Sequence, residues 1–277
     1  MKIYKVHEQL IAERSEIFYD LEGWTLDQIF QTDKVFKVLS KLIDEGKVAA
    51  RAKFSSTTLE PPIESQELWA SGVTYLRSKA GREEESEASG GANFYDKVYH
   101  ADRPELFFKA TRHRIVGHGG KVRIRRDSTW NVPEPELTMA INSHGKIIGY
   151  TIGNDMSSRS IEGENPLYLP QAKTYDGCAS LGPCLLLASE AMNPNTKITI
   201  GIQRDGEIVF QDGIEISQMK RSQEELVSYL FSECSFPFGC FLMTGTGIVP
   251  SKDFTLQSKD VISIIIDPVG ELVNSVE

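Results

Sequence analysis

The chain has 277 residues, of which 40% are hydrophobic and 25% charged, as in an ordinary soluble globular protein with a sizeable core. The formal net charge is -9 and no basic stripe with interleaved aromatics stands out, which argues against nucleic acid as a partner. The four cysteines form no CxxC pair, so we expect neither a disulfide framework nor a zinc site, and we expect a cytoplasmic location. No stretch approaches the roughly 20 apolar residues of a spanning helix, so no membrane association is expected.

The first 62 residues are expected to form a small N-terminal α+β domain. Two short strands and one helix are predicted from their apolar spacing, over residues 2–6, 16–19 and 33–43. Residues 60–62 include two prolines and interrupt regular structure. We therefore expect the domain boundary there, with a catalytic domain over residues 63–277.

A charge-dense segment over residues 77–87 lies between two predicted strands, at 68–75 and 105–109. It is typical of a solvated helix followed by a flexible loop, since Gly90 and Gly91 come next. A mobile lid is the alternative, because enzymes often place closing elements in glycine-flanked polar segments. On the second strand, Glu105, Phe107 and Lys109 share one face.

Three carboxylates are expected to converge in the middle of the chain. Glu134 and Glu136 open an alternating strand pattern that runs to Ile141, so they project to the same face. A second predicted strand, over residues 146–152, delivers Asp155 at its end. Paired glutamates are more often a solvated strand face, but the apolar context favours burial. Three oxygen ligands without His or Cys suit Mg²⁺, Ca²⁺ or Mn²⁺ better than Zn²⁺.

Downstream of Asp155 the chain supplies positive groups at Arg159 and Lys173, which suit an anionic ligand. Further strands and one helix are predicted over residues 185–187, 198–204, 208–210, 223–231 and 261–266. The small-residue loop at 244–247 offers amides and hydroxyls that can hold a carboxylate, although such loops are more often plain turns.

Four segments of the chain resemble the fumarylacetoacetate hydrolase superfamily. They read EPEL from 134, GYTIGNDMSSR from 149, KTYDGCASLGP from 173 and TGTGIVP from 244. They follow the family's order at plausible spacing, and the resemblance runs from residue 68 to the C-terminus. It is strongest to members that dehydrate 2-keto-3-deoxy sugar acids, through ELWASGVTY, RPELFFKATRHRIVGHG and ENPLYLPQAKTYDGCASLGP.

The resemblance implies an α+β, mostly β fold, a mixed β-roll that buries a divalent ion, and a homo-oligomer, either a homodimer or a homotetramer. The implied ion is Mg²⁺, with Ca²⁺ or Mn²⁺ as alternatives, and its implied ligands are Glu134, Glu136 and Asp155. Lys173 is implied beside the ion. The residues expected to contact the substrate are Tyr75, Arg159 and Thr246.

Two positions depart from the family pattern. The carbon–carbon hydrolases of the family carry a His and Glu pair soon after the tyrosine that matches Tyr75, whereas residues 76–81 contain no His. This argues against hydrolysis. Ser160 stands where many relatives have Asp, and we expect it to change local hydrogen bonding only.

A metal-dependent dehydratase of a 2-keto-3-deoxy sugar acid, such as 2-keto-3-deoxy-D-arabinonate, is the predicted function. A 2-keto acid that chelates the ion has an acidic C3 proton, which Lys173 is predicted to remove. Glu105 is the predicted acid or base for the departing C4 hydroxyl, and the product would be a dioxo acid. Three alternatives stay open: hydrolysis of a carbon–carbon bond in a 2,4-diketo acid, isomerisation or decarboxylation of a related acid, and a non-catalytic binding protein.

Overall fold

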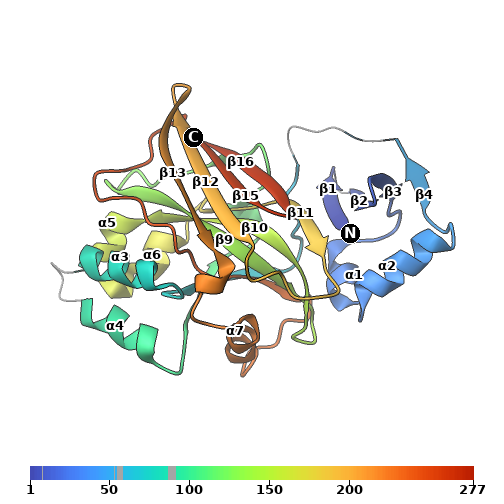
Figure 1. Cartoon of the computed structure of the whole chain (residues 1–277), viewed down its shortest axis with the longest axis horizontal. Coiled ribbons are helices and arrows are strands. Elements are labelled where there is room, and N and C mark those ends of the chain that lie inside the picture. Colours follow the sequence, from blue (N-terminus) through green and yellow to red (C-terminus); the bar gives the residue numbers. More distant parts are fainter. Residues whose placement is uncertain (8, 53, 55–58, 87–91) are drawn as a thin grey trace.

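The computed structural model describes all residues except 8, 53, 55–58 and 87–91, and its described strands form two sheets (Figure 1). In spatial order the larger sheet contains β4 (Ala49–Arg51), β3 (Ile17–Asp20), β2 (Gln9–Arg14), β1 (Lys2–Val6), β11 (Ala179–Leu187), β10 (Ile147–Ser158), β9 (Asn131–Ile141), β14 (Cys240–Met243), β5 (Glu67–Gly72) and β6 (Glu105–Ala110), while β7 (Ile115–Val116) pairs with β11 outside this order. The smaller sheet contains β13 (Glu207–Glu215), β12 (Lys197–Arg204), β15 (Val261–Ile266), β16 (Gly270–Val276) and β8 (Lys121–Val122). The expected α+β, mostly β fold is confirmed.

The helices gather at two ends of the larger sheet (Figure 1). Beside the N-terminal strands lie α1 (Leu26–Gln31) and α2 (Val35–Asp44). At the opposite end lie α3 (Leu76–Ser86), α4 (Ala92–His100), α5 (Arg159–Glu164) and α6 (Leu169–Lys173), and α7 (Gln223–Leu230) lies apart from both groups. In the part of the chain that the structure describes, every helix is too short or too polar to cross a membrane.

The two sheets pack against each other through alternate residues of β9. Leu137, Met139 and Ile141 join one apolar cluster with isoleucines of β12 and β15 from the smaller sheet. Because side chains alternate along a strand, Glu134 and Glu136 are turned to the other face of the larger sheet. All residues of β9 are buried, so these two carboxylates are enclosed by protein and do not form a solvated face.

The N-terminal strands extend the larger sheet, because β1 pairs antiparallel with β11 through Lys2 with Leu186 and Ile3 with Leu185. The helix predicted over residues 33–43 is present as α2. The short helix α1 was not predicted, although Thr25 and Gln28 form a capping box that the sequence carries. The division into domains 1–62 and 63–277 stays a prediction.

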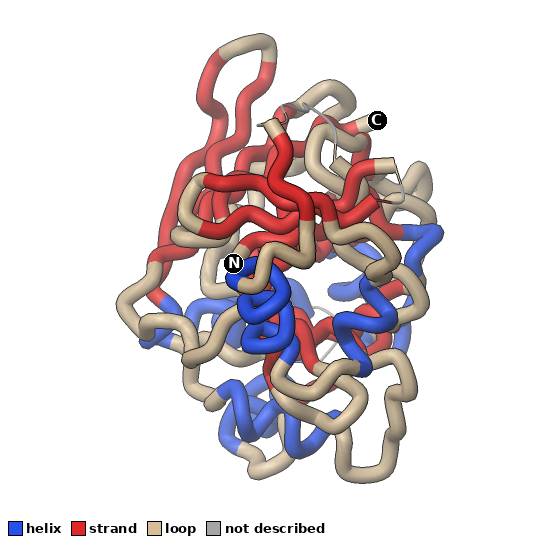
Figure 2. The backbone as a smooth tube through the Cα atoms, turned by 90° about the vertical axis from the view of Figure 1, so that its right-hand side faces the viewer, coloured by secondary structure: helices blue, strands red, loops and turns tan. Residues whose placement is uncertain are grey.

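The hairpin of β12 and β13 projects beyond the rest of the chain, as both backbone views show (Figures 1 and 2). Near its tip, Ile208 and Val209 are exposed by 62% and 40%. On the neighbouring β15, Val261 and Ile265 are also exposed. The smaller sheet therefore presents apolar side chains to solvent.

Candidate active site

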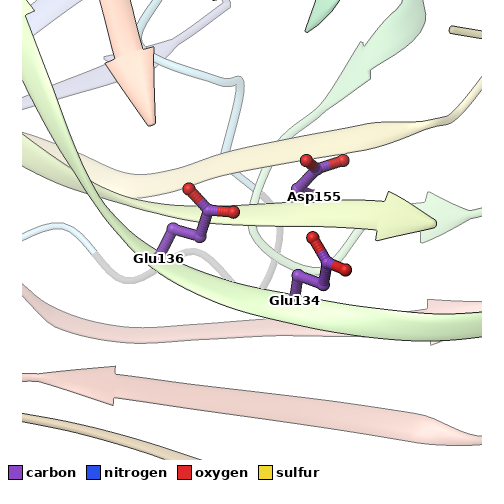
Figure 3. Close-up of side chains that lie close together, drawn as sticks. All are labelled: Glu134, Glu136 and Asp155. Carbon is purple, nitrogen blue, oxygen red and sulfur yellow. The ribbon is translucent and has the colours of Figure 1, made fainter. Parts of the chain in front are cut away.

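Three carboxylates meet where β9 and β10 run side by side. Figure 3 shows Glu134 and Glu136 on one strand and Asp155 on its neighbour. The antiparallel register places Asp155 opposite Glu134 and Gly153 opposite Glu136. One oxygen from each carboxylate lies within 4.8 Å of the others, and the three residues are no more than 4% exposed. Asp155 lies inside β10, which continues to Ser158, so the prediction that the strand ends before Asp155 was wrong.

Two cations hold Glu134. The Nζ of Lys173, at the end of α6, donates to Glu134 Oε2 at 2.6 Å, and the Nη2 of Arg159 donates to Glu134 Oε1 at 3.2 Å. Lys173 also donates to Asp155 Oδ2 at 3.2 Å and to Ser157 Oγ at 2.6 Å. Its ammonium therefore has three acceptors, which matches its three N–H donors.

The carboxylates of Glu134 and Glu136 differ in their surroundings and in their pKa. Burial raises the pKa of Glu134, but the charges of Lys173, Arg159 and Arg82 outweigh it and hold that pKa below its ordinary value. Burial, and then the charges of Asp155 and Glu134, raise the pKa of Glu136 well above its ordinary value. The charged form of Glu136 is therefore disfavoured at this position, whereas the charged form of Glu134 is favoured.

The group fits a hard divalent cation. Among the described residues no ion pair includes Glu136, whose Oε2 accepts only the Gly245 N–H, at 2.5 Å. A cation held between the three carboxylates would stabilise the charge that burial opposes. Since every donor is a carboxylate oxygen, the residues present suit Mg²⁺.

Glu105 lies on β6 near this group. Although part of the residue reaches the surface, its Oε2 is buried and has no hydrogen-bond partner among the described residues. Burial raises the pKa of Glu105, opposed by the charge of Arg82 and assisted by that of Glu162. The carboxyl occupies space left by the glycine opposite it, because a Cβ on Gly72 would lie 1.9 Å from Glu105 Oε2.

Comparison with known proteins identifies the family. The family model described as fumarylacetoacetate (FAA) hydrolase C-terminal matches residues 77–277. The chain belongs to the fumarylacetoacetate hydrolase family. It is 42% identical over 280 residues to the "Probable 2-keto-3-deoxyxylonate dehydratase" of Haloferax volcanii, covering 97% of this chain and 95% of that one. It is 41% identical over 237 residues to the "2-dehydro-3-deoxy-D-arabinonate dehydratase" of Saccharolobus solfataricus, covering 85% and 80%.

A solved structure of the fumarylacetoacetate hydrolase family has nearly the same fold. It is described as "2-keto-3-deoxy-D-arabinonate dehydratase complexed with magnesium and 2,5-dioxopentanoate", and it is 34% identical to this chain with a TM-score of 0.84. The superposition covers 100% of this chain and 99% of that one. The resemblance inferred from the sequence segments is confirmed, and the buried carboxylates Glu134, Glu136 and Asp155 could hold an ion such as the magnesium of that structure.

The predicted site residues of this chain differ in whether they line the pocket formed by the three carboxylates. Lys173, Arg159 and Thr246 line the pocket above the carboxylates together with Glu134, Glu136 and Asp155. Neither Tyr75 nor Glu105 is among the described residues that line this pocket, although Gly72, opposite Glu105, does line it. Tyr75 is 1% exposed, its hydroxyl has no hydrogen-bond partner among the described residues, and its ring lies against Gly247. The roles assigned to these residues stay predictions.

Sequence reasoning missed a buried ion pair that joins two helices over the pocket. Arg82 of α3 pairs with Glu162 of α5, and their side chains are 6% and 1% exposed. Glu162 also lies 3.6 Å from Lys173. Since α5 begins at Arg159, the spacing of three residues to Glu162 would have placed both on one helix face. The charge-dense segment is thus not simply solvated, although the last part of the suggested lid, residues 87–91, lies outside the described residues.

Proposed function

We propose that the protein is a magnesium-dependent dehydratase that removes water from a 2-keto-3-deoxy sugar acid, such as 2-keto-3-deoxy-D-arabinonate, and yields a dioxo acid. One observation carries this proposal: Lys173 contacts two of the three converging carboxylates in their pocket, and the buried Oε2 of Glu105 lies against Gly72, which lines the same pocket. Elimination of water needs a base at C3 and an acid at C4, and Lys173 and Glu105 can supply them. The names of the two dehydratase relatives support the same reaction.

Residues of the pocket would hold and orient the substrate. Glu134, Glu136 and Asp155 would hold Mg²⁺, which supplies Lewis acidity to the carboxylate and keto oxygens of a 2-keto acid. Thr246 and Arg159 line the same pocket and suit the carboxylate end of the substrate. Tyr75 is too enclosed for direct contact in this conformation and would act by supporting the loop at Gly247.

Lys173 would remove the C3 proton. Burial lowers its pKa, but the charges of Asp155, Glu134 and Glu162 outweigh burial and raise that pKa above its ordinary value. A cation held among those carboxylates would oppose this effect and favour the neutral amine that a base requires.

Glu105 would give its proton to the C4 hydroxyl, which leaves as water while the C3–H electron pair forms the C3–C4 double bond. Because burial raises its pKa, the carboxyl keeps its proton to a higher pH than an exposed glutamate does. Tautomerisation of the product then gives the dioxo acid. No His in residues 76–86 is available to activate water, which disfavours carbon–carbon hydrolysis.

Gly72 offers a test of Glu105 that leaves the acid itself in place. A methyl group at this position would overlap Glu105 Oε2, so Gly72→Ala should displace the carboxyl from the site. We expect turnover to fall by about 10²-fold or more, as for loss of a general acid, with the Kd for Mg²⁺ unchanged. Steady-state assays measure turnover, and calorimetry measures the Kd. Gly201→Ala is the matched control, because a methyl group there would meet open space. Unchanged turnover in Gly72→Ala would exclude Glu105 as the acid.

The assembly and location belong to the same proposal. The exposed apolar residues of β13 and β15 support a homodimer or homotetramer, whose mass light scattering measures in solution. The four cysteines are unpaired and three of them are buried, which supports a reducing cytoplasm.

The reaction is tested by incubating the purified protein with Mg²⁺ and a panel of 2-keto-3-deoxy acids. We expect loss of water and accumulation of a dioxo acid, identified by mass spectrometry, and we expect chelator to abolish it. Formation of pyruvate instead would indicate carbon–carbon cleavage. Binding of the acids without formation of any product would indicate a non-catalytic binding protein.

A further inference from the structure

A second lysine lies behind the carboxylates, and no step of the proposed reaction uses it. Lys109 lies on β6, four residues after Glu105, and it is fully buried. Its Nζ lies 2.5 Å from Asp155 Oδ1 and 3.0 Å from the carbonyl oxygen of Met156, to which it donates. It also donates to the carbonyl oxygen of Lys173. The ammonium thus forms an ion pair with Asp155 and donates hydrogen bonds to two backbone carbonyls.

The two lysines contact opposite oxygens of one carboxylate. Lys173 reaches Asp155 Oδ2 at 3.2 Å from the pocket, which it lines. Lys109 reaches Asp155 Oδ1 from the other side and is not among the described residues that line the pocket. The ammonium of Lys173 donates only to side chains. That of Lys109 donates to two backbone carbonyls, so β10 and the end of α6 fix the position of Lys109.

We propose that Lys109 is a positioning residue, which sets the affinity of the site for its divalent cation by fixing the carboxylate of Asp155. A carboxylate without such a partner can rotate away from the orientation that a cation requires. The free-energy cost of ordering it then weakens binding of the cation. Groups that hold metal ligands in this way typically change metal affinity by about 10- to 100-fold when removed. The inference rests on the proposed metal site and not on the reaction.

The same ammonium also holds the carbonyl of Lys173, so it ties Asp155 to the residue proposed as the base. The Tyr175 ring, 5.9 Å from Lys109 Nζ, covers part of the remaining surface of the ammonium. Water therefore has little access to compete for Asp155 from this side.

The test measures Mg²⁺ binding by calorimetry, without substrate, in the full-length protein. Lys109→Met should raise the Kd for Mg²⁺ by about 10- to 100-fold, and Mg²⁺ in excess of the new Kd should restore kcat to within a few-fold of the parent. The matched control is Lys5→Met. Lys5 is also buried, and it pairs with Glu60 at 3.1 Å and Glu64 at 3.6 Å, away from the site, so its replacement should leave the Kd unchanged.

Should Lys109→Met fail to fold, Lys109→Gln provides the same measurement, because its amide can still donate to a backbone carbonyl while the charge is lost. An unchanged Kd in the folded variant would overturn the inference. So would a raised Kd whose loss of kcat excess Mg²⁺ did not restore, since Lys109 would then act in the chemistry. A parent that bound Mg²⁺ but dehydrated no acid would overturn the proposed function and leave this inference standing, whereas a parent that bound no Mg²⁺ would overturn both.

Discussion

Replacing Lys173 with Met is expected to lower kcat by about 10²- to 10⁴-fold, the range for loss of a general base, while Mg²⁺ binding is retained. The variant loses the nitrogen that lies between Glu134, Asp155 and Ser157, but it removes none of the oxygen ligands of the metal. Because Lys173 also holds Glu134 and Asp155, any rise in the Kd for Mg²⁺ should stay within the roughly 10- to 100-fold expected for loss of a group that holds metal ligands, and excess Mg²⁺ should not restore turnover. Turnover at saturating substrate and calorimetry measure the two quantities, with Lys5→Met as the control for loss of a buried lysine.

Exchange of the C3 hydrogens with solvent deuterium isolates the step assigned to Lys173, since it reports proton removal even when elimination fails. Lys173→Met should lose this exchange together with turnover. Exchange at the parent rate would show that Lys173 is not the base and would make Glu105 the leading candidate. A raised KM with kcat preserved would instead mean that Lys173 only pairs with the substrate carboxylate.

The substitution Glu136→Gln should abolish measurable Mg²⁺ binding and leave the fold largely intact. Because burial and two neighbouring carboxylates raise the pKa of Glu136, the metal-free site favours the neutral form of this side chain. Glutamine resembles that form in shape and charge, and its oxygen can keep the hydrogen bond from Gly245. Calorimetry measures binding and circular dichroism the fold. Parent-like binding in a folded variant would place the metal elsewhere.

The pH dependence of metal binding in the parent protein should have the same origin. Mg²⁺ must displace the proton from Glu136, so its Kd should fall by about tenfold per pH unit below the pKa of that carboxyl and level off above it. The folding stability of the metal-free protein should depend on pH in the opposite direction. A carboxyl whose pKa is raised in the folded state contributes stability at low pH and loses it as pH rises through that pKa, so the metal-free protein should become less stable toward alkaline pH. Thermal unfolding with and without Mg²⁺ at several pH values measures both effects.

The convergence of the three carboxylates could be predicted from sequence because its geometry is local. Alternation along one strand aligns Glu134 with Glu136, and a hairpin to the next strand brings Asp155 across. The extent of β10 could not be predicted in the same way. Four of its last five residues, Asn154, Asp155, Ser157 and Ser158, are polar and yet buried. A pattern of apolar residues does not detect such a strand end.

Arg82, Glu162 and Lys109 could not be found from spacing, because each acquires its role from a segment distant in sequence. Arg82 lies in a charge-dense stretch that is typical of a solvated helix, and only its contact with Glu162, 80 positions away, makes it a buried residue. Lys109 ends an apolar strand, where lysines commonly reach solvent. Its ion-pair partner and its two hydrogen-bond acceptors come from two other elements, β10 and the end of α6.

The pairing of β1 with β11 has a practical consequence for anyone who shortens this chain. Residues 185 and 186 of β11 bond β1 on the side away from β10. A fragment that begins after the prolines at 61 and 62 would leave this row of backbone donors and acceptors open. Unpaired strand edges recruit other chains, so such a fragment would be prone to aggregation during expression even if its metal-binding carboxylates were formed. A shortened enzyme would need a substitute strand, or charged side chains along that edge, to stay in solution.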